Sequence, residues 1–170
     1  DLVLAQGDRT AALAAALAAS GRRLLFGHVE AGLRSFDKWA PFPEEKIRVM
    51  TDHVSDLLFA PTRLAARNLA REGIAPGAVF VTGNTAVDAL LWAAARPHRF
   101  RAPELARLSD GARVAVVTLH RQESFGAPLE SLLRGVAAAA DRRPDLIWVY
   151  PVHPNPAVRR AARALARHPR

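Results

Sequence analysis

Short apolar runs alternate along the chain with longer segments of helical periodicity. Apolar runs of four to eight residues bounded by turn residues are typical of buried strands in parallel sheets. Such runs predict strands at residues 2–5, 24–29, 57–60, 79–82, 113–118 and 146–152. The segments between them predict helices over residues 10–19, 44–54 and 62–73, around 87–91, over 127–142 and from 157 onward. Strands that alternate with helices through short turns form right-handed βαβ units, so the sequence predicts an α/β fold with parallel sheets.

Residues 96–103 interrupt this alternation with a polar segment that contains two prolines. Segments of this composition often join domains. We therefore predict two Rossmann-like parallel-sheet halves, residues 1–96 and residues 112–170, with a linker region over residues 97–111. Both halves are expected to be incomplete, because the chain starts within a strand and ends after one and a half βαβ units of the second half. The sequence is interpreted as the middle of a larger two-domain protein.

The composition is that of a globular protein with an excess of positive charge. Half of the 170 residues are apolar, and the formal net charge is +8. The cations are nearly all arginine, with lysine only at 38 and 46, and they are spread over the predicted helices rather than gathered beside aromatic residues. Solvated helix faces are therefore a better interpretation than a nucleic-acid groove. A small polyanion such as a nucleotide diphosphate also suits this charge.

Three absences bear on the compartment and on the partners. The chain has no cysteine, which excludes a disulfide framework and a thiolate metal site. No apolar stretch reaches the roughly 20 residues of a membrane-spanning helix, and the first residues lack the pattern of a signal peptide. We expect a cytoplasmic protein without a nucleic-acid or membrane partner.

Acidic residues follow the first two predicted strands, at the edge where an α/β sheet binds its ligands. Asp8 comes after the first strand, Glu30 after the second, and Glu44 opens the following helix behind Pro43. Asp8 has two equal interpretations, as the N-cap of the next helix or as a carboxylate of the site. We expect Glu44 to face the site and Glu45 to support the helix start. Converging carboxylates suit general acid–base catalysis.

Two residues near Glu30 are candidate partners for its carboxylate. Arg34 is a candidate ion-pair partner. His28 and Glu30 have the H-x-E spacing of metal ligands, but no third ligand stands at a useful spacing. We therefore expect no metal site.

The second half carries imidazole and guanidinium groups at corresponding positions. His120 and Arg121 follow its first strand, and His153 follows the next one. Cations and hydrogen-bond donors at a strand end, ahead of a helix, suit phosphate binding. A single histidine in a loop is more often structural, but the repeated placement favours a phosphate site. The sequence contains no G-x-G-x-x-G or Walker-type loop.

Several longer motifs occur together and in one order. They are Q-G-D near the start, H-V-E-A-G-L-R, P-F-P-E-E, D-H-V-S-D-L-L-F-A-P-T, V-T-G-N-T-A-V-D-A-L, H-R-Q-E-S-F-G and Y-P-V-H-P-N-P. With these motifs the chain resembles the bacterial non-hydrolysing UDP-N-acetylglucosamine 2-epimerases over nearly its whole length. The resemblance implies a GT-B-like fold of two Rossmann-like domains with the active site between them. It also implies a role in supplying precursors of cell-surface polysaccharides.

The reaction that the resemblance implies needs no metal and no nicotinamide cofactor. UDP-GlcNAc loses its C2 proton and its UDP to give 2-acetamidoglucal, and UDP adds back after protonation on the other face to give UDP-ManNAc. By motif, the residues that match the catalytic groups are Asp8, Glu30, Glu44 and His120. The residues assigned to substrate binding are Arg34, His120, Arg121, Glu123 and His153.

The resemblance extends to regulation and assembly. Arg121 and His153 match positions that contact a second, activating UDP-GlcNAc in similar enzymes, which are homodimers. The chain departs from the family pattern at Arg9, Gln122 and Ile47, where threonine, arginine and asparagine are expected. The family's G-T-R-P-E loop and its later Ser/Glu nucleotide-binding segment have no counterpart, so we expect little or no activity from this chain alone.

Two other functions remain open at this point. A hydrolysing relative would release free ManNAc and UDP, but the H-R-Q-E-S-F-G loop argues against it. A non-catalytic remnant would bind a sugar nucleotide or a partner subunit without proton exchange at C2.

Overall fold

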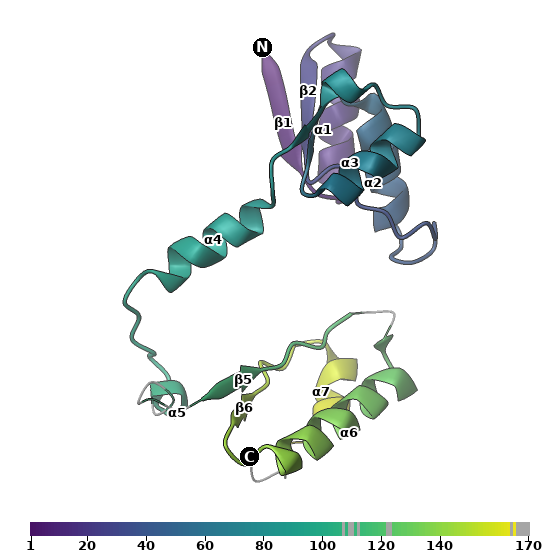
Figure 1. The fold of residues 1–170 in the computed structure, drawn as a ribbon. Coiled ribbons are helices and arrows are strands. Elements are labelled where there is room, and N and C mark those ends of the chain that lie inside the picture. Colours follow the sequence, from purple (N-terminus) through teal and green to yellow (C-terminus); the bar gives the residue numbers. More distant parts are fainter. Residues whose placement is uncertain (107, 109–110, 112, 122–123, 164, 166–170) are drawn as a thin grey trace. The chain divides into compact units, whose positions relative to one another are not determined.

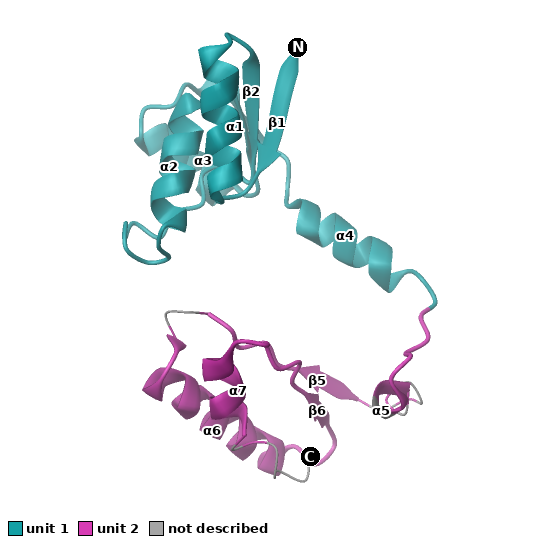
Figure 2. Cartoon of the chain, turned by 180° about the vertical axis from the view of Figure 1, so that it is seen from behind, with its two compact units in different colours: residues 1–97 teal, residues 98–170 magenta. Residues whose placement is uncertain are grey.

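The chain folds into two compact units. The computed structural model describes residues 1–106, 108, 111, 113–121, 124–163 and 165. Unit 1 spans residues 1–97 and unit 2 spans residues 98–170 (Figure 2). The linker region predicted from the sequence begins at this division. It contains a short helix that the sequence did not predict, α5 (Pro103–Ala106).

Unit 1 is built on a four-stranded parallel sheet. Its strands pair in chain order and are β1 (Leu2–Gln6), β2 (Leu25–Val29), β3 (Leu57–Ala60) and β4 (Val79–Val81). Each strand coincides with an apolar run, so the strand predictions for this half are confirmed. Because every pairing is parallel, the carboxyl ends of all four strands lie at one edge of the sheet.

Three helices cover one face of this sheet. They are α1 (Thr10–Gly21), α2 (Glu44–Val54) and α3 (Arg63–Arg71), and they lie on the same side of the strands in Figure 1 and Figure 2. Because the strands pair in chain order, right-handed crossovers place every connecting helix on the same face. The turn η1 (Pro76–Ala78) and the helix α4 (Thr85–Ala94) complete the unit.

The covered face of the sheet holds the apolar core of unit 1. Phe26 packs with Ala16 and Ala19 of α1, and Leu58 packs with Leu69 of α3. The opposite face presents exposed apolar side chains, among them Leu2, Leu4, Leu25 and Phe80. The described helices therefore bury one face of a sheet whose residue pattern is apolar on both faces.

A buried carboxylate of α2 joins the elements of unit 1. Asp52 is 1 % exposed and is contacted by His28 Nδ1 at 2.6 Å, by the Gly32 N–H at 3.1 Å and by Arg34 Nη1 at 2.8 Å. His28 also donates from Nε2 to the carbonyl oxygen of Gly7 at 2.9 Å. Through these contacts one carboxylate connects α2 with the ends of both β1 and β2.

Gly32 allows the loop after β2 to lie against α3. Its φ is +80°, and a Cβ at this position would lie 2.4 Å from the carbonyl oxygen of Ala65. Its own carbonyl oxygen accepts a hydrogen bond from Asn68 Nδ2 at 3.0 Å. A side chain would have to displace helix backbone, so only glycine fits here.

Unit 2 contains one complete βαβ unit. Strand β5 (Val114–Val116) pairs in parallel with β6 (Ile147–Val149), and α6 (Ala127–Arg142) connects them. Helix α7 (Pro156–Ala162) follows, and its Val158 packs with Leu129 and Leu133 of α6. Both strands are present but shorter than predicted. Within the described part of the chain, no helix combines the length and the apolar character that crossing a membrane requires.

Replacement of Asp52 by alanine tests its role as the link within unit 1. We expect Asp52→Ala to lower the free energy of unfolding by about 3 kcal/mol, because it leaves the buried His28 Nδ1 and the Gly32 N–H without their hydrogen-bond partner and removes one of the two carboxylates that pair with Arg34. Urea unfolding followed by circular dichroism measures the loss. The control is Asp88→Ala, which removes an exposed carboxylate from α4. An equal effect of the two substitutions would show that Asp52 is not the link.

Candidate active site

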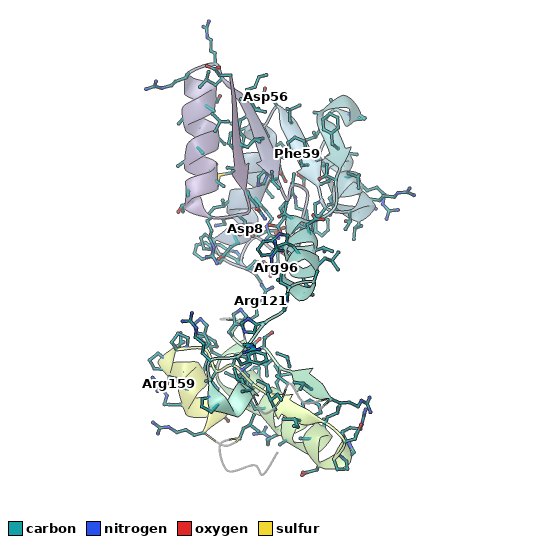
Figure 3. All side chains as sticks on the ribbon, turned by 90° about the vertical axis from the view of Figure 1, so that its left-hand side faces the viewer. Asp8, Asp56, Phe59, Arg96, Arg121 and Arg159 are labelled. Carbon is teal, nitrogen blue, oxygen red and sulfur yellow. The ribbon has the colours of Figure 1, made fainter. Side chains whose placement is uncertain are left out.

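Three acidic residues stand at the carboxyl edge of the sheet in unit 1. Asp8 lies two residues beyond β1, Glu30 directly follows β2, and Glu44 is the first residue of α2. Figure 3 shows Asp8 at the opposite end of the unit from Asp56, which directly precedes β3. The carboxyl edge is where α/β sheets bind their ligands, so this edge is the candidate site.

Asp8 pairs with an arginine of α2. Its Oδ2 accepts a hydrogen bond from Arg48 Nη2, and the two side chains are 29 % and 14 % exposed. The N-cap of α1 is Arg9, and no side chain caps this helix. The N-cap interpretation of Asp8 is therefore wrong, because its carboxylate is turned to α2 instead.

Glu44 is held by the residue that follows Asp8. Arg9 Nη1 donates to Glu44 Oε1 at 2.8 Å, and the Glu44 side chain is 17 % exposed while that of Arg9 is 79 % exposed. Since Arg9 is bonded to Asp8 in the chain, this ion pair and the Asp8–Arg48 pair together tie the start of α1 to the first turns of α2. Asp8 and Glu44 thereby share one corner of the carboxyl edge.

Glu45, the second residue of α2, holds the loop before this helix. Its side chain is 4 % exposed, and its Oε1 accepts hydrogen bonds from the N–H groups of Ser35 and Phe36, both at 3.0 Å. Its Oε2 lies 3.4 Å from Arg48 Nη1. Glu45 lies in the first turn of α2, as expected, and its carboxylate also binds the loop that precedes this helix.

Glu30 lies beside the end of β1 in a less charged environment. Its φ is +74°, which is uncommon for a residue other than glycine. Its Oε1 accepts a hydrogen bond from Asn84 Nδ2 at 3.4 Å, and its Oε2 lies 3.9 Å from where a Cβ on Gly7 would be. Among the residues that the structure describes, no cation forms an ion pair with Glu30.

Arg34 is not the partner of Glu30. Its guanidinium is 1 % exposed and donates from Nε and Nη2 to the two carboxylate oxygens of Glu72, each at 2.6 Å. Burial by itself lowers the pKa of Arg34, but the hydrogen bonds and charges of Glu72 and Asp52 outweigh it and raise the pKa above its ordinary value. Arg34 therefore fastens the loop after β2 to the end of α3. This position does not support its expected role in substrate binding.

The partners of the three carboxylates divide them into two kinds. Asp8 and Glu44 each face an arginine, whereas Glu30 faces an amide. Neighbouring carboxyl groups with different partners can take different roles in proton transfer. The arrangement offers carboxyl groups in two different environments, which suits general acid–base chemistry.

Unit 2 brings two of its histidines together. The rings of His120 and His153 stack with their centroids 5.7 Å apart and their planes at 13°. His153 Nδ1 accepts a hydrogen bond from the Asn155 N–H at 3.2 Å, so Nε2 carries the proton of the neutral ring. Arg121 follows His120 in the chain and is exposed, whereas Glu123 lies outside the described residues. These donors follow β5 and β6 and suit an anionic ligand.

Tyr150 fixes the segment that carries His120. Its hydroxyl donates a hydrogen bond to the carbonyl oxygen of Leu119 at 2.9 Å. Burial raises the pKa of the Tyr150 phenol, which keeps it in the protonated form that donates. Leu119, which precedes His120, is thus fastened to the residue that follows β6.

The residues that sequence reasoning missed are the charged partners of the carboxylates. Arg48 lies four residues after Glu44 and three after Glu45, and Asp52 lies four residues after Arg48. This spacing places all of them along one side of a helix. It is the feature of the sequence from which contacts among these charged side chains could be predicted. No sequence pattern near Arg9 indicates that it pairs with Glu44.

The family of the chain follows from comparison with known proteins. The family model described as UDP-N-acetylglucosamine 2-epimerase matches residues 1–170. The chain belongs to this family. The UDP-N-acetylglucosamine 2-epimerase of Escherichia coli K12 is 40 % identical over 174 residues, which cover 99 % of this chain and 46 % of that protein. The Bacillus subtilis enzyme of the same name is 42 % identical over 162 residues, which cover 95 % of this chain and 42 % of that protein.

Solved structures of the family share the fold. The Staphylococcus aureus MnaA–UDP co-structure superposes with a TM-score of 0.85 at 41 % identity and covers 96 % of this chain and 44 % of that chain. The Neisseria meningitidis UDP-GlcNAc 2-epimerase bound to UDP-GlcNAc has a TM-score of 0.84 at 33 % identity, over 98 % of this chain and 47 % of that chain. The expected GT-B-like α/β fold class is confirmed. The chain spans less than half the length of the curated relatives named above.

Removal of the Arg48 side chain tests the charge arrangement around Asp8. We expect Arg48→Met to lower the free energy of unfolding by about 2 kcal/mol, because it leaves the buried Glu45 carboxylate without a cation. Arg9→Met is the matched control, since it removes a more exposed ion pair that contributes at most about 1 kcal/mol. Chemical denaturation of both variants measures the difference. Equal losses would mean that the buried pairs of Arg48 contribute no more to stability than the exposed pair of Arg9.

Proposed function

We propose that this chain carries part of the active site of a non-hydrolysing UDP-N-acetylglucosamine 2-epimerase. The observation that carries the proposal is the placement of Asp8, Glu30 and Glu44 at one edge of the unit 1 sheet. Family membership supports it, as do the similar structures solved with UDP and with UDP-GlcNAc.

The proposed reaction inverts C2 of the sugar. A carboxylate takes the C2 proton, the electrons of the C2–H bond form a C1=C2 double bond, and the C1–O bond to UDP breaks. The intermediate is 2-acetamidoglucal, with UDP as the leaving group. A carboxyl group then protonates C2 from the opposite face while UDP adds back to C1, which gives UDP-ManNAc. Transfers on two faces call for carboxyl groups in different roles, which Asp8, Glu30 and Glu44 would supply.

The residues of unit 2 are proposed to bind the diphosphate. His120 and Arg121 follow β5, and His153 follows β6. Glu123 is proposed to bind another part of the substrate, because a carboxylate cannot donate to a diphosphate. Hydrogen-bond donors on the diphosphate would stabilise the negative charge that UDP acquires as the C1–O bond breaks. We further assign Arg121 and His153 to a second, activating UDP-GlcNAc.

The larger organisation of the protein is part of the same proposal. Unit 1 would form the C-terminal part of the first Rossmann-like domain, and unit 2 the N-terminal part of the second. A homodimeric state and a cytoplasmic location are predictions from the family resemblance. Analytical ultracentrifugation of the whole protein tests the first of them, and fractionation of the cells that make it tests the second.

Proton exchange at C2 tests the activity. The chain alone and a chimera, in which residues 1–170 replace the matching segment of the E. coli enzyme, are incubated with UDP-GlcNAc in D2O. Proton NMR of the chimera should show loss of the sugar H2 signal and appearance of UDP-ManNAc, while the chain alone should show little exchange. In the chimera, Asp8→Asn, Glu30→Gln and Glu44→Gln should each lower kcat by about 100- to 10,000-fold, as expected for loss of a general acid or base.

The outcomes separate the proposed function from its alternatives. Glu130→Gln, an exposed glutamate of α6, is the control and should leave kcat unchanged. Free ManNAc in place of UDP-ManNAc would favour a hydrolysing enzyme. Binding of UDP-GlcNAc without exchange in the chimera would favour a non-catalytic remnant. Full activity of the three variants would overturn the role of the carboxylates.

A further inference from the structure

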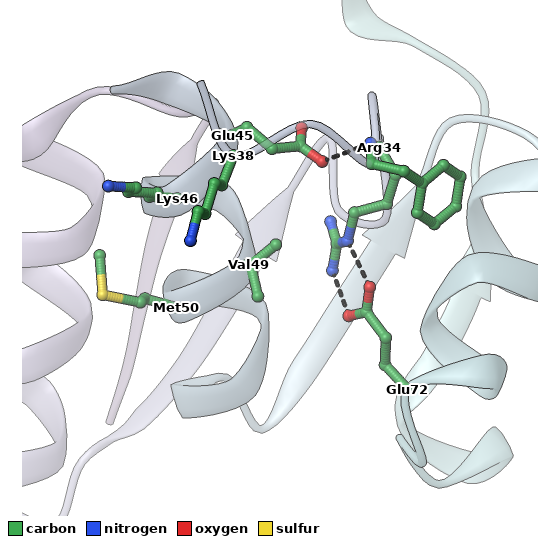
Figure 4. A pocket seen from close by; sticks show the side chains of 8 residues that line it. Arg34, Lys38, Glu45, Lys46, Val49, Met50 and Glu72 are labelled. Atoms are coloured by element: carbon green, nitrogen blue, oxygen red, sulfur yellow. Dashed lines mark hydrogen bonds and ion pairs between the residues drawn. The ribbon is translucent and has the colours of Figure 1, made fainter. Parts of the chain in front are cut away.

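A hollow of unit 1 lies between α2, the loop before it and the end of α3. It has a volume of about 410 Å³ and is lined by Arg34, Phe36, Lys38, Glu45, Lys46, Val49, Met50 and Glu72 (Figure 4). We call it the lysine pocket. Asp8, Glu30 and Glu44 are not among its lining residues. Its volume falls within the range of small-molecule sites in proteins.

The wall of the lysine pocket is apolar where it is open. Phe36 is 70 % exposed and Met50 46 % exposed, and Val49 lies between Met50 and Arg34 in Figure 4. Phe36 keeps its position because Glu45 binds its N–H, and its φ is +61°. Exposed apolar side chains around a hollow mark a surface that binds a partner or ligand.

The charges of the lysine pocket leave a net positive rim. Glu72 is paired with Arg34, and Glu45 with Arg48. Within the described residues, neither Lys38 nor Lys46 forms an ion pair with a carboxylate. A group that binds beside the two ammonium ions therefore gains by carrying negative charge.

Both ammonium groups lie near the same aromatic ring. Lys46 Nζ lies 3.8 Å and Lys38 Nζ 5.7 Å from the centroid of Trp39. Trp39 is in turn 5.5 Å from Phe42, over which Lys46 Nζ lies at 5.2 Å. Such cation–π contacts favour one position of each flexible lysine stem. They gather at one site the only two lysines of a chain whose other basic side chains, histidine aside, are arginine.

We propose that the lysine pocket binds an amphipathic organic anion. Its apolar chain would lie against Phe36, Val49 and Met50, and its anionic head group would bind the ammonium groups of Lys38 and Lys46. The apolar wall discriminates against a bare inorganic anion, and the unpaired lysines discriminate against a neutral amphiphile. The proposal goes beyond the epimerase activity and does not depend on it.

Three probes separate the contributions of the ligand's alkyl group and of its negative charge. Octyl phosphate carries both, octyl glucoside carries the alkyl group alone, and inorganic phosphate carries the charge alone. The two octyl compounds are used as monomers, below the concentration at which micelles form. Titration of the 170-residue chain, followed by 15N–1H NMR, should show saturable binding of octyl phosphate around the lysine pocket. The other two probes should bind at least about ten-fold more weakly, the equivalent of one lost contact of about 1.4 kcal/mol.

Because the chain has only two lysines, both can be labelled and followed by NMR as ligand binds. Reductive methylation with 13C-formaldehyde labels only Lys38, Lys46 and the N-terminal amine, and it retains the positive charge. Octyl phosphate should shift both dimethyl-lysine signals with the same dissociation constant and leave the N-terminal signal in place. A shift of the N-terminal signal alone would overturn the assignment to this pocket.

Matched variants test each wall of the lysine pocket. Met50→Gln and Lys46→Gln should each weaken octyl phosphate by about ten-fold. Leu64→Gln and Arg67→Gln are the controls, since both alter exposed residues of α3 outside the lining, and they should leave the affinity unchanged. The unperturbed amide spectra of the variants verify that they fold.

Other outcomes would overturn the proposal. Equal binding of octyl glucoside would show that the lysines do not select charge, and equal binding of inorganic phosphate would reduce the pocket to a surface ion site. The last experiment measures binding of the protein to vesicles of anionic phosphatidylglycerol. Binding to vesicles that depends on Lys46 and Met50, without binding of monomeric octyl phosphate, would identify a membrane surface as the partner instead.

Discussion

The buried carboxylate of Asp52 is the constraint on which the candidate site depends. A charge without solvent is tolerated only when it is fully paired, and Asp52 is paired with His28, Gly32 and Arg34. His28 in turn donates a hydrogen bond to the carbonyl oxygen of Gly7, so the position of Gly7 also depends on Asp52. Glu30 stands two residues after His28, and Asp8 directly follows Gly7. Asp8 and Glu30 therefore take their places from this buried network as well as from their own contacts with Arg48 and Asn84.

Helix α2 serves both sites of unit 1 with different sides. Glu44, Arg48 and Asp52 recur every four residues, and they reach the carboxylate corner and the core. Lys46 and Met50 have the same spacing, shifted by two residues, and they line the lysine pocket. With 3.6 residues per turn, a shift of two residues rotates a side chain to the opposite side of the helix. Glu45 lies at the boundary, where it contacts Arg48 and also lines the pocket.

The two units contribute different chemical groups. Unit 1 presents carboxylates at the ends of its strands, whereas unit 2 presents the stacked His120 and His153 and the exposed Arg121 at the ends of β5 and β6. Proton transfer at carbon requires the first kind of group, and a departing diphosphate requires the second. This division is what the proposed epimerase reaction would use, and each set can be tested by substitution without the other.

The sequence by itself determined the longer helices and the strands of both units, their parallel pairing, the family, and the edge at which Asp8, Glu30 and Glu44 stand, but not the short helix α5. These features follow from local periodicity and from motifs, which are read along the chain. Only the tertiary structure decided the partners: Arg34 with Glu72, Arg48 with Asp8, and Arg9 with Glu44. Those pairs join residues 35 to 40 positions apart. Long charged side chains reach whichever opposite charge the packing of α1, α2 and α3 brings near, and no local pattern encodes that meeting.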